Sequence, residues 1–334
     1  MGKVPACPAA PAATRVPRHR HGTVPARTGW AVAACYHRRM TRRAWLLFAA
    51  VSLVWGVPYL FIKVAVAELA PVVVVFVRVT MAALLLWPVA LRRGAVRQLG
   101  RRLPQLLVLS LLEIAAPFLL ISMGEQRIAS SLAGLLIAAM PLFVALLALR
   151  FDPAERVGGL RLLGLLLGLG GVAALLGIDA GHDAAQLEGA AMVLLATGSY
   201  ASATLVVKRF FADVPTLGVV TAATTIAAAL LAPFAVAAAP AHLPSLRVTL
   251  ALLALGVVCT AAALLLYFAL IVQAGPSRAA VITYVNPAVA VALGVAVLGE
   301  PLTAAIVVGF LLIIAGSWLS TRAPAARGAR VPAG

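Results

Sequence analysis

Two long apolar runs joined by a short polar turn constrain this chain more than any other feature. Residues 274–320 read AGPSRAAVITYVNPAVAVALGVAVLGEPLTAAIVVGFLLIIAGSWLS. The turn at Gly299-Glu300-Pro301 follows about 20 mostly apolar residues, the length that a helix needs to cross the core of a bilayer. Pro301 suits the first turn of a following helix, where its missing N–H leaves no hydrogen bond unmade. The stretch therefore predicts two membrane-spanning helices joined by a tight turn.

The same pattern occurs earlier, in residues 127–177. Its marker residues recur 145 or 146 positions later, in the pairs Ser131 and Ser277, Pro141 and Pro287, Glu155 and Glu300, Gly164 and Gly309, and Gly171 and Gly316. A period this long is typical of the two halves of a transporter and too long for a solenoid repeat. In each half the two glycines lie seven residues apart, on one helical face that another helix could approach closely.

The composition points to a polytopic membrane protein. Of 334 residues, 63% are hydrophobic and 11% are charged, whereas soluble domains carry about 25% charged residues. The net charge of +17 gathers at the ends of apolar runs rather than on one face, which argues against nucleic acid as a partner. Neither the three cysteines nor the five histidines form a metal-ligand or disulfide pattern. We expect no cofactor, no metal and no enzymatic activity.

Ten apolar runs follow the first 40 residues. They lie near residues 44–62, 70–91, 103–122, 130–149, 159–178, 187–207, 216–237, 248–272, 279–298 and 302–320. Five runs per half is an odd number, so the second half must enter the membrane from the opposite side. The predicted fold is an all-α polytopic membrane protein, with ten transmembrane helices as two inverted five-helix repeats. The predicted parts are a disordered extension (1–40), the first repeat (41–178), the second repeat (187–321) and a short basic tail (322–334).

The distribution of basic residues predicts the orientation. If the N-terminus is cytoplasmic, sixteen Arg and Lys residues from Met40 onward lie at cytoplasmic ends, and only Lys63, Arg127 and Arg247 lie at outer ends. Cytoplasmic segments of membrane proteins carry this excess of positive charge. We therefore predict that both termini are cytoplasmic in a bacterial inner membrane. Because Met40 is followed directly by Arg42-Arg43 and the first apolar run, it is also the predicted physiological start.

Two ionisable residues lie inside the predicted spans. Arg78 is about two turns into the second span, and Glu113 is near the middle of the third. Ionisable groups at such depth are costly and normally face a bundle interior or a wet cavity. One interpretation is a role in handling substrate or protons, with a Glu113 charge that matters to the cycle. The other is an ion pair that only holds two helices together.

Further polar and proline residues mark the spans. Candidate cavity residues are Trp55, Tyr59, Tyr200, Tyr267, Tyr284 and Asn286; aromatic residues near span ends could instead anchor the interface. Pro141 and Pro287 free the carbonyls of Ile137 and Thr283, so both fourth spans are predicted to bend alike. Glu155 and Glu300 are predicted to cap the first turns of the fifth and tenth helices.

These features resemble those of the EamA-type branch of the drug/metabolite transporter superfamily. The similar segments are VWGVPYLFIK (54–63), Arg78, RIASSLAGLLIAAMPLF (127–143), AGPSRAAVITYVNPAVAVALGVAVLGEPLT (274–303) and the glycine-bearing fifth and tenth spans. The resemblance covers about residues 42–320. It implies two inverted five-helix repeats, a central cavity lined by spans one to four and six to nine, and spans five and ten packed outside. The extension and Glu113 depart from the family pattern.

The resulting hypothesis is a secondary transporter in the inner membrane. Its substrate would be a small molecule, and the resemblance favours export of metabolites, amino acids or drugs by alternating access. Proton coupling and a homodimer are left open. The alternative is a non-transporting assembly factor or sensor built on the same fold. Such a sensor would usually carry a soluble domain.

Overall fold

The computed structural model describes residues 40–97, 99–151, 159–179, 183–279 and 281–321. The chain divides into residues 1–41 and residues 42–334, and the fold below is that of the second unit. The predicted disordered extension, the basic tail and the Glu155 cap lie outside the described residues. These expectations therefore stay predictions.

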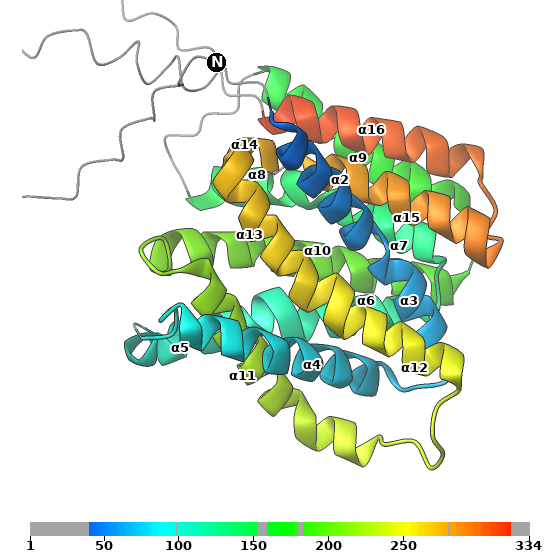
Figure 1. The fold of residues 1–334 in the computed structure, drawn as a ribbon. Helices are drawn as coiled ribbons and strands as arrows, with labels where there is room; N and C mark the ends of the chain where they lie inside the picture. The colour runs from blue at the N-terminus through cyan, green and yellow to red at the C-terminus, as the bar shows by residue number, and fades with distance from the viewer. Residues whose placement is uncertain (1–39, 98, 152–158, 180–182, 280, 322–334) are drawn as a thin grey trace, which may run out of the picture. The chain divides into compact units, whose positions relative to one another are not determined.

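The described residues form helices joined by short turns and contain no strand (Figure 1). The helices of the first half are α2 (Arg42–Gly56), α3 (Pro58–Ala65), α4 (Pro71–Arg92), the 3₁₀ turn η1 (Gly100–Arg102), α5 (Leu103–Ser110), the π-helix η2 (Leu111–Ala115), α6 (Ala116–Glu125), α7 (Ser130–Ile137), α8 (Met140–Phe151) and α9 (Gly159–Asp179). The helices of the second half are α10 (Ala184–Phe210), α11 (Thr216–Ala237), α12 (Leu246–Leu253), the π-helix η3 (Ala254–Ala262), α13 (Ala263–Ala274), α14 (Pro276–Ala279), α15 (Ile282–Leu298) and α16 (Ala304–Thr321).

Within the described residues, seven helical segments are long and apolar enough to cross a membrane. They are Arg42–Ala65, Pro71–Arg92, Gly100–Glu125, Ser130–Leu147, Ala184–Phe210, Thr216–Ala237 and Leu246–Ala274. Three shorter apolar helices span Leu162–Leu176, Ile282–Leu298 and Ala304–Ser320. All ten lie at the predicted runs, which supports a multi-pass membrane protein. The count of ten crossings stays a prediction, because these three apolar stretches of 10–17 residues reach at most the lower limit of the usual spanning length.

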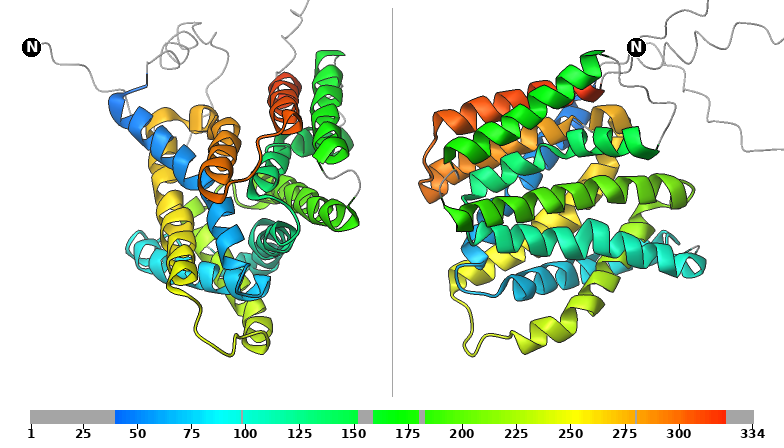
Figure 2. Two further views of the ribbon diagram at one scale, coloured as in Figure 1. Left: turned by 90° about the vertical axis from the view of Figure 1, so that its right-hand side faces the viewer. Right: turned by 180° about the vertical axis from the view of Figure 1, so that it is seen from behind.

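Helices at related positions of the two halves pack against each other. The second helices, α4 and α11, are in contact, and so are the fifth helices, α9 and α16 (Figure 2). The third span of each half also contains a π-helix, η2 in one and η3 in the other. Such π segments inside helices are rare. Their occurrence at related positions is a structural counterpart of the sequence repeat.

The predicted glycine face is where α9 and α16 meet. A Cβ added at Gly171 would lie 2.8 Å from Leu312 Cβ and 2.9 Å from the carbonyl oxygen of Gly309. A Cβ added at Gly316 would overlap the backbone of Gly164 and Gly168. The close helix approach predicted from glycine spacing is therefore confirmed, and the partner of each helix is its repeat-related counterpart.

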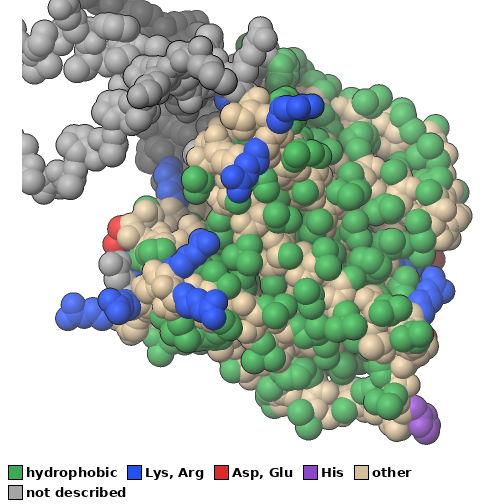
Figure 3. Space-filling view, viewed as in Figure 1, with side chains coloured by type: hydrophobic (Ala, Val, Ile, Leu, Met, Phe, Trp, Pro, Cys, Tyr) green, Lys and Arg blue, Asp and Glu red, His purple; other side chains and the backbone are tan. Residues whose placement is uncertain are grey.

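The surface of the second unit is largely apolar. In Figure 3, hydrophobic side chains cover the middle of the visible face, and Lys and Arg side chains lie toward two opposite edges. Exposed leucines occur on α4, α9, α10 and α16, for example Leu84, Leu166, Leu195 and Leu311. An apolar patch of this extent is typical of a surface that contacts another apolar phase, here the lipid.

Candidate functional site

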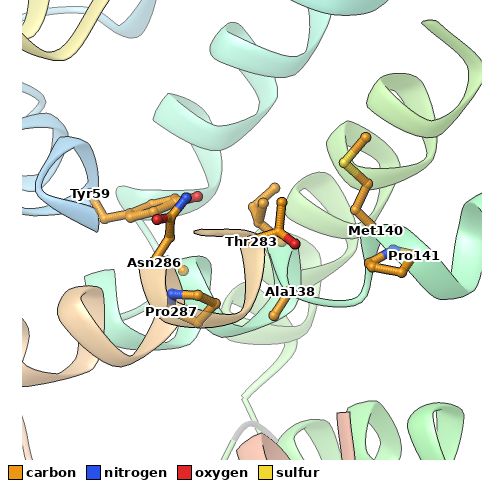
Figure 4. A pocket seen from close by; sticks show the side chains of 9 residues that line it. Tyr59, Ala138, Met140, Pro141, Thr283, Asn286 and Pro287 are labelled. Atoms are coloured by element: carbon orange, nitrogen blue, oxygen red, sulfur yellow. The ribbon is translucent and has the colours of Figure 1, made fainter. Parts of the chain in front are cut away.

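A small cavity lies where the interrupted fourth span of the first half meets α3 and α15. It measures about 80 Å³, and Figure 4 shows its lining side chains. They are Tyr59 on α3; Gly134, Ile137, Ala138, Met140 and Pro141 on α7, α8 and the turn between them; and Thr283, Asn286 and Pro287 on α15. Three side chains bring polar groups to an otherwise apolar wall. Tyr59 and Asn286 were predicted cavity residues, and both lie here.

The backbone of this span is interrupted directly before Pro141. Helix α7 ends at Ile137, and α8 begins at Met140. Around the break, Ala138 N donates to Leu135 O at 3.0 Å and Leu142 N donates to Ala139 O at 2.9 Å. Both bonds have the i to i−3 spacing of a 3₁₀ turn, which absorbs the loss of the Pro141 N–H.

The repeat-related Pro287 behaves differently. It lies inside α15, which continues from Ile282 to Leu298. The expectation that both fourth spans bend alike is therefore wrong at the level of helix boundaries. In the second half the interruption lies before α15, near Val281, where α14 and α15 are separated. Prolines at repeat-related positions are therefore not accompanied by equivalent interruptions of the two helices.

Two glycines, Gly56 and Gly134, allow the helices around the cavity to approach each other closely. A Cβ at Gly134 would lie 2.5 Å from Ala290 Cβ on α15 and 3.4 Å from the Tyr59 ring. A Cβ at Gly56 would overlap Val289 on α15. Small residues of this kind let helices meet at backbone distance. They bring α15 against both α2 and α7, and so bring Asn286 toward Tyr59.

The amide of Asn286 links α15 to α2. In the orientation that satisfies both partners, its nitrogen donates to Ile282 O at 2.9 Å and to Ser52 O at 3.1 Å. Trp55 on α2 and Tyr267 on α13 pack as a tilted pair, with ring centroids 4.7 Å apart. Tyr200 on α10 and Tyr59 both pack against the buried cluster around Ile62 and Leu255. Tyr284 is half-buried on α15 and is not among the residues that line the cavity.

Arg78 is buried and held by two groups from other helices. Its Nε donates to Thr260 Oγ1 on η3 at 2.9 Å, and its Cζ lies 4.0 Å from the centroid of the Phe118 ring on α6. The ion pairs among the described residues include Arg102–Asp213 and Arg127–Glu188, and neither of these involves Arg78 or Glu113. The predicted option of an Arg78–Glu113 ion pair is therefore not realised in this conformation, because a hydroxyl and a ring face hold the guanidinium instead.

Glu113 lies in the π-helix η2 and is half-buried. Its charge acts on Tyr200 of α10, and Arg78 also interacts electrostatically with Tyr200. Tyr200 thus interacts with both ionisable groups that the sequence singled out. Widened π segments often occur at functional positions of helices, so the location is consistent with a functional carboxylate.

Sequence reasoning assigned the wrong helix to Glu300. Its carboxylate accepts hydrogen bonds from Ser130 N at 2.7 Å and from Ser131 N at 2.9 Å, and so caps α7 of the other half. Helix α16 is capped by Thr303 instead, whose Oγ1 accepts from Ile306 N. Burial raises the pKa of Glu300, but hydrogen bonds from Ser131 and Ser130 outweigh it and hold the pKa below the usual 4.5.

Lys63, Glu125, Ser130 and Glu300 gather at one end of the helices. Lys63 Nζ donates to the main-chain oxygens of Glu125 and Ile128, and Arg127 pairs with Glu188 on α10 at 3.2 Å. We call this the Glu125 end: the C-terminal ends of α3, α6 and α15, the N-terminal ends of α7 and α10, and the turns between them. The sequence did not predict this network, because each of its charged residues, taken alone, is ordinary for the end of a membrane span.

Comparison with known proteins agrees with this architecture. The EamA-like transporter family matches residues 42–177 and 187–322. The chain is 28% identical over 287 residues to the uncharacterized inner membrane transporter YedA of Escherichia coli K12, which covers 82% of this chain and 92% of that protein. It is 27% identical over 297 residues to the uncharacterized transporter YvbV of Bacillus subtilis, covering 87% of this chain and 95% of that protein.

An archaeal protein and a solved structure extend the comparison. An uncharacterized transporter of Archaeoglobus fulgidus is 24% identical over 284 residues, with 84% of this chain and 99% of that protein covered. A crystal structure titled only as that of a protein has a TM-score of 0.60 at 23% identity and covers 83% of this chain and 96% of its own; it supports the fold alone. Since the family match takes in both halves, this chain belongs to the EamA-like transporter family.

Proposed function

We propose that this chain is an inner-membrane secondary transporter that exports small metabolites, amino acids or drugs by alternating access. The observation that carries the proposal is the cavity bounded by Tyr59 and Asn286, which is formed by helices of both halves. Inverted repeats that enclose a shared site can exchange two mirror-related arrangements, each open to one face. The membership in a transporter family supports the same reading.

The conformation described above has close contacts between the two halves at the Glu125 end, and we interpret this end as closed. There Glu300 from the second half caps α7 of the first half, and Lys63 ties α3 to the α6–α7 turn. In the ten-span arrangement with cytoplasmic termini, this end is the outer side. A cavity of about 80 Å³ is smaller than the roughly 300–1,000 Å³ typical of ligand pockets. Substrate binding would therefore require the cavity to widen when an end opens.

The proposed site residues divide into two groups. Tyr59, Thr283 and Asn286 would provide hydrogen bonds to a polar group of the substrate, and the apolar wall would contact its carbon skeleton. A second, polar region would be formed by Arg78, Glu113 and Tyr200. A change of the Glu113 charge in this region would affect the transport cycle. An ionisable residue inside a membrane protein is a functional candidate by default.

A growth screen tests the function. A strain that overexpresses the chain is compared with the empty vector and with the Asn286→Ala variant on amino acids, amino-acid analogues and antimicrobials. The proposal expects at least one compound for which only the wild type confers tolerance, with a lower intracellular concentration of that compound. Equal sensitivity of all three strains, with the protein present in the membrane, would favour the non-transporting alternative.

Reporter fusions test the topology. Fusions after Arg322 and within residues 180–186 should report cytoplasmic and outer locations, respectively, because five spans separate these points from each other. An outer signal after Arg322, or a cytoplasmic signal within residues 180–186, would contradict the ten-span arrangement.

A further inference from the structure

One carboxyl group of the Glu125 end lacks the partners that buried charges have. The Glu125 side chain at the last turn of α6 is 0% exposed. Neither of its carboxylate oxygens has a hydrogen-bond partner among the described residues. Charged carboxylates are rarely buried unless they are paired and hydrogen-bonded. A neutral, protonated carboxyl group fits this environment, and an ionised one does not.

The neighbouring lysine does not provide the missing pair. Lys63 Nζ lies 2.6 Å from Glu125 O and 2.8 Å from Ile128 O, so it donates to main-chain carbonyls rather than to the carboxylate. The last carbonyls of a helix lack partners within the helix, and Lys63 satisfies one of them at the end of α6. Its ammonium group is therefore directed at the backbone of the α6–α7 turn.

The other charged groups that face this region are also engaged. Glu300, on the α15–α16 turn, acts on Glu125 electrostatically and is held in its ionised form by the N–H groups of α7. From α4, Arg78 is bound to Thr260; from α10, Glu188 pairs with Arg127. Tyr59 on α3 also interacts electrostatically with Glu125. Two nearby carboxylates resist simultaneous ionisation, and the N–H groups of α7 favour the ionised form of Glu300.

We infer that Glu125 is a proton-binding site and that the proton bound there keeps the Glu125 end closed. Loss of that proton leaves a buried anion beside the anionic Glu300, and its oxygens have no hydrogen-bond partner among the described residues. Separation of α6 and α7 from α3 and the α15–α16 turn relieves this by admitting water to the carboxylate. A proton fits better than a metal ion, because no group of three or more His, Cys, Asp or Glu that could hold a metal occurs in the described parts. In addition, the Lys63 ammonium already lies beside the site.

The inference rests on the proposed function but is tested without any substrate. Ser122 lies one turn before Glu125, is 1% exposed, and its hydroxyl has no hydrogen-bond partner among the described residues. Ser122→Cys therefore places a small thiol beside the site without removing a contact. Leu243→Cys, at a position 96% exposed, is the matched control for the chemistry of the label. Both are made in a background with Cys7, Cys35 and Cys259 replaced by Ala.

The measurement is the rate of maleimide labelling of the purified protein in lipid nanodiscs between pH 5.5 and 8.0. Each Ser122→Cys rate is divided by the Leu243→Cys rate at the same pH. We expect this ratio to rise about tenfold as the single proton is lost. With Glu125→Gln, which mimics the protonated group, the ratio should stay low at every pH. With Glu125→Asp, the rise should persist with a shifted midpoint.

Several results would overturn the inference. One is a rise in Glu125→Gln that matches the rise in the parent protein. Another is an unshifted midpoint in Glu125→Asp, which decides the matter if Glu125→Gln fails to fold. A third is a low labelling ratio at pH 8.0 when KCl is replaced by NaCl. This result would assign the site to a metal cation. If labelling follows Glu125 but no compound is transported, the proton site stands and the proposed function fails.

Discussion

Glu300 caps a helix of the opposite repeat, with its carboxylate 2.7 Å from the main-chain nitrogen of Ser130. The two residues are 170 positions apart in the chain, yet the bond has the form of an ordinary helix N-cap. A Cβ at Gly294, in the last turns of α15, would meet both the Glu300 carboxylate and Ser130 Oγ. The lack of a side chain at Gly294 thus leaves space for the contact. The two halves of the chain are joined at the Glu125 end by this contact.

Replacing Glu300 by Gln should weaken the α7 cap. Loss of an N-cap interaction typically costs about 0.5–2 kcal/mol, so the thermal midpoint in detergent should fall. Thr303→Ala, which removes the conventional cap of α16, is the matched control. If Glu300 joins the repeats, Glu300→Gln should also loosen the Glu125 end as measured by cysteine labelling, and Thr303→Ala should not.

The Glu300 cap also predicts a dependence of stability on pH. Because hydrogen bonding holds the folded-state pKa of Glu300 below the usual 4.5, the stabilisation is present above about 4.5 and is lost as pH falls through the lower, folded-state pKa. Stability of the wild type should thus fall relative to Glu300→Gln below about pH 4.5. Parallel pH curves for the two proteins would contradict the assignment.

Adjacent glycines on α9 should differ in their response to a large side chain. A Cβ at Gly171 meets Leu312 and the backbone of α16, whereas a Cβ at Gly170 meets nothing within 4 Å. Gly171→Leu should therefore separate α9 from α16 and destabilise the protein by about 1–3 kcal/mol, the usual range for overpacking. Gly170→Leu should change the thermal midpoint little. Similar midpoints for both variants would show that the packing of α9 on α16 is wrong.

Arg78 should be coupled to Thr260 rather than to Glu113. A double-mutant cycle of Arg78→Met with Thr260→Val should give an interaction energy of about 0.5–3 kcal/mol, as residues in direct contact do. The cycle of Arg78→Met with Glu113→Gln should be additive to within about 0.5 kcal/mol. For the same reason, the exchange Arg78→Glu with Glu113→Arg should not restore transport. Restoration would revive the ion-pair interpretation.

Glu113→Gln should fold normally, because no hydrogen bond or ion pair of Glu113 occurs among the described contacts. If the charge of Glu113 matters to the cycle, the variant should lose activity or lose its change of rate between pH 6 and 8. Transport by Glu113→Gln at the wild-type rate across that range would reassign Glu113 to helix packing.

The repeat and the apolar runs could be predicted because they are local and periodic. The spacing of Gly164 and Gly171, and of Gly309 and Gly316, was enough to predict a close helix face. The sequence could not show that these two faces meet each other. That pairing depends on how the halves pack, and no local pattern encodes it.

The site was predicted less completely for the same reason. Tyr59 and Asn286 could be found as polar exceptions in apolar spans, but Gly134 and Thr283 carry no such signal. Arg78 was identified from its cost in the membrane, yet its partner Thr260 is 182 residues away. Glu125 escaped notice because a carboxylate at a span end is ordinary unless the fold buries it, and only the packed structure reveals that it is buried.

Solute counterflow in proteoliposomes tests the central claim most directly. The purified protein is supplied with the compound that the growth screen identifies, and exchange is measured for the wild type, Asn286→Ala and Gly170→Leu. The account predicts saturable flux that unlabelled compound on the opposite side accelerates, a large loss in Asn286→Ala and little change in Gly170→Leu. Flux that neither saturates nor responds to compound on the opposite side, or equal flux in the wild type and Asn286→Ala, would contradict alternating access through this cavity.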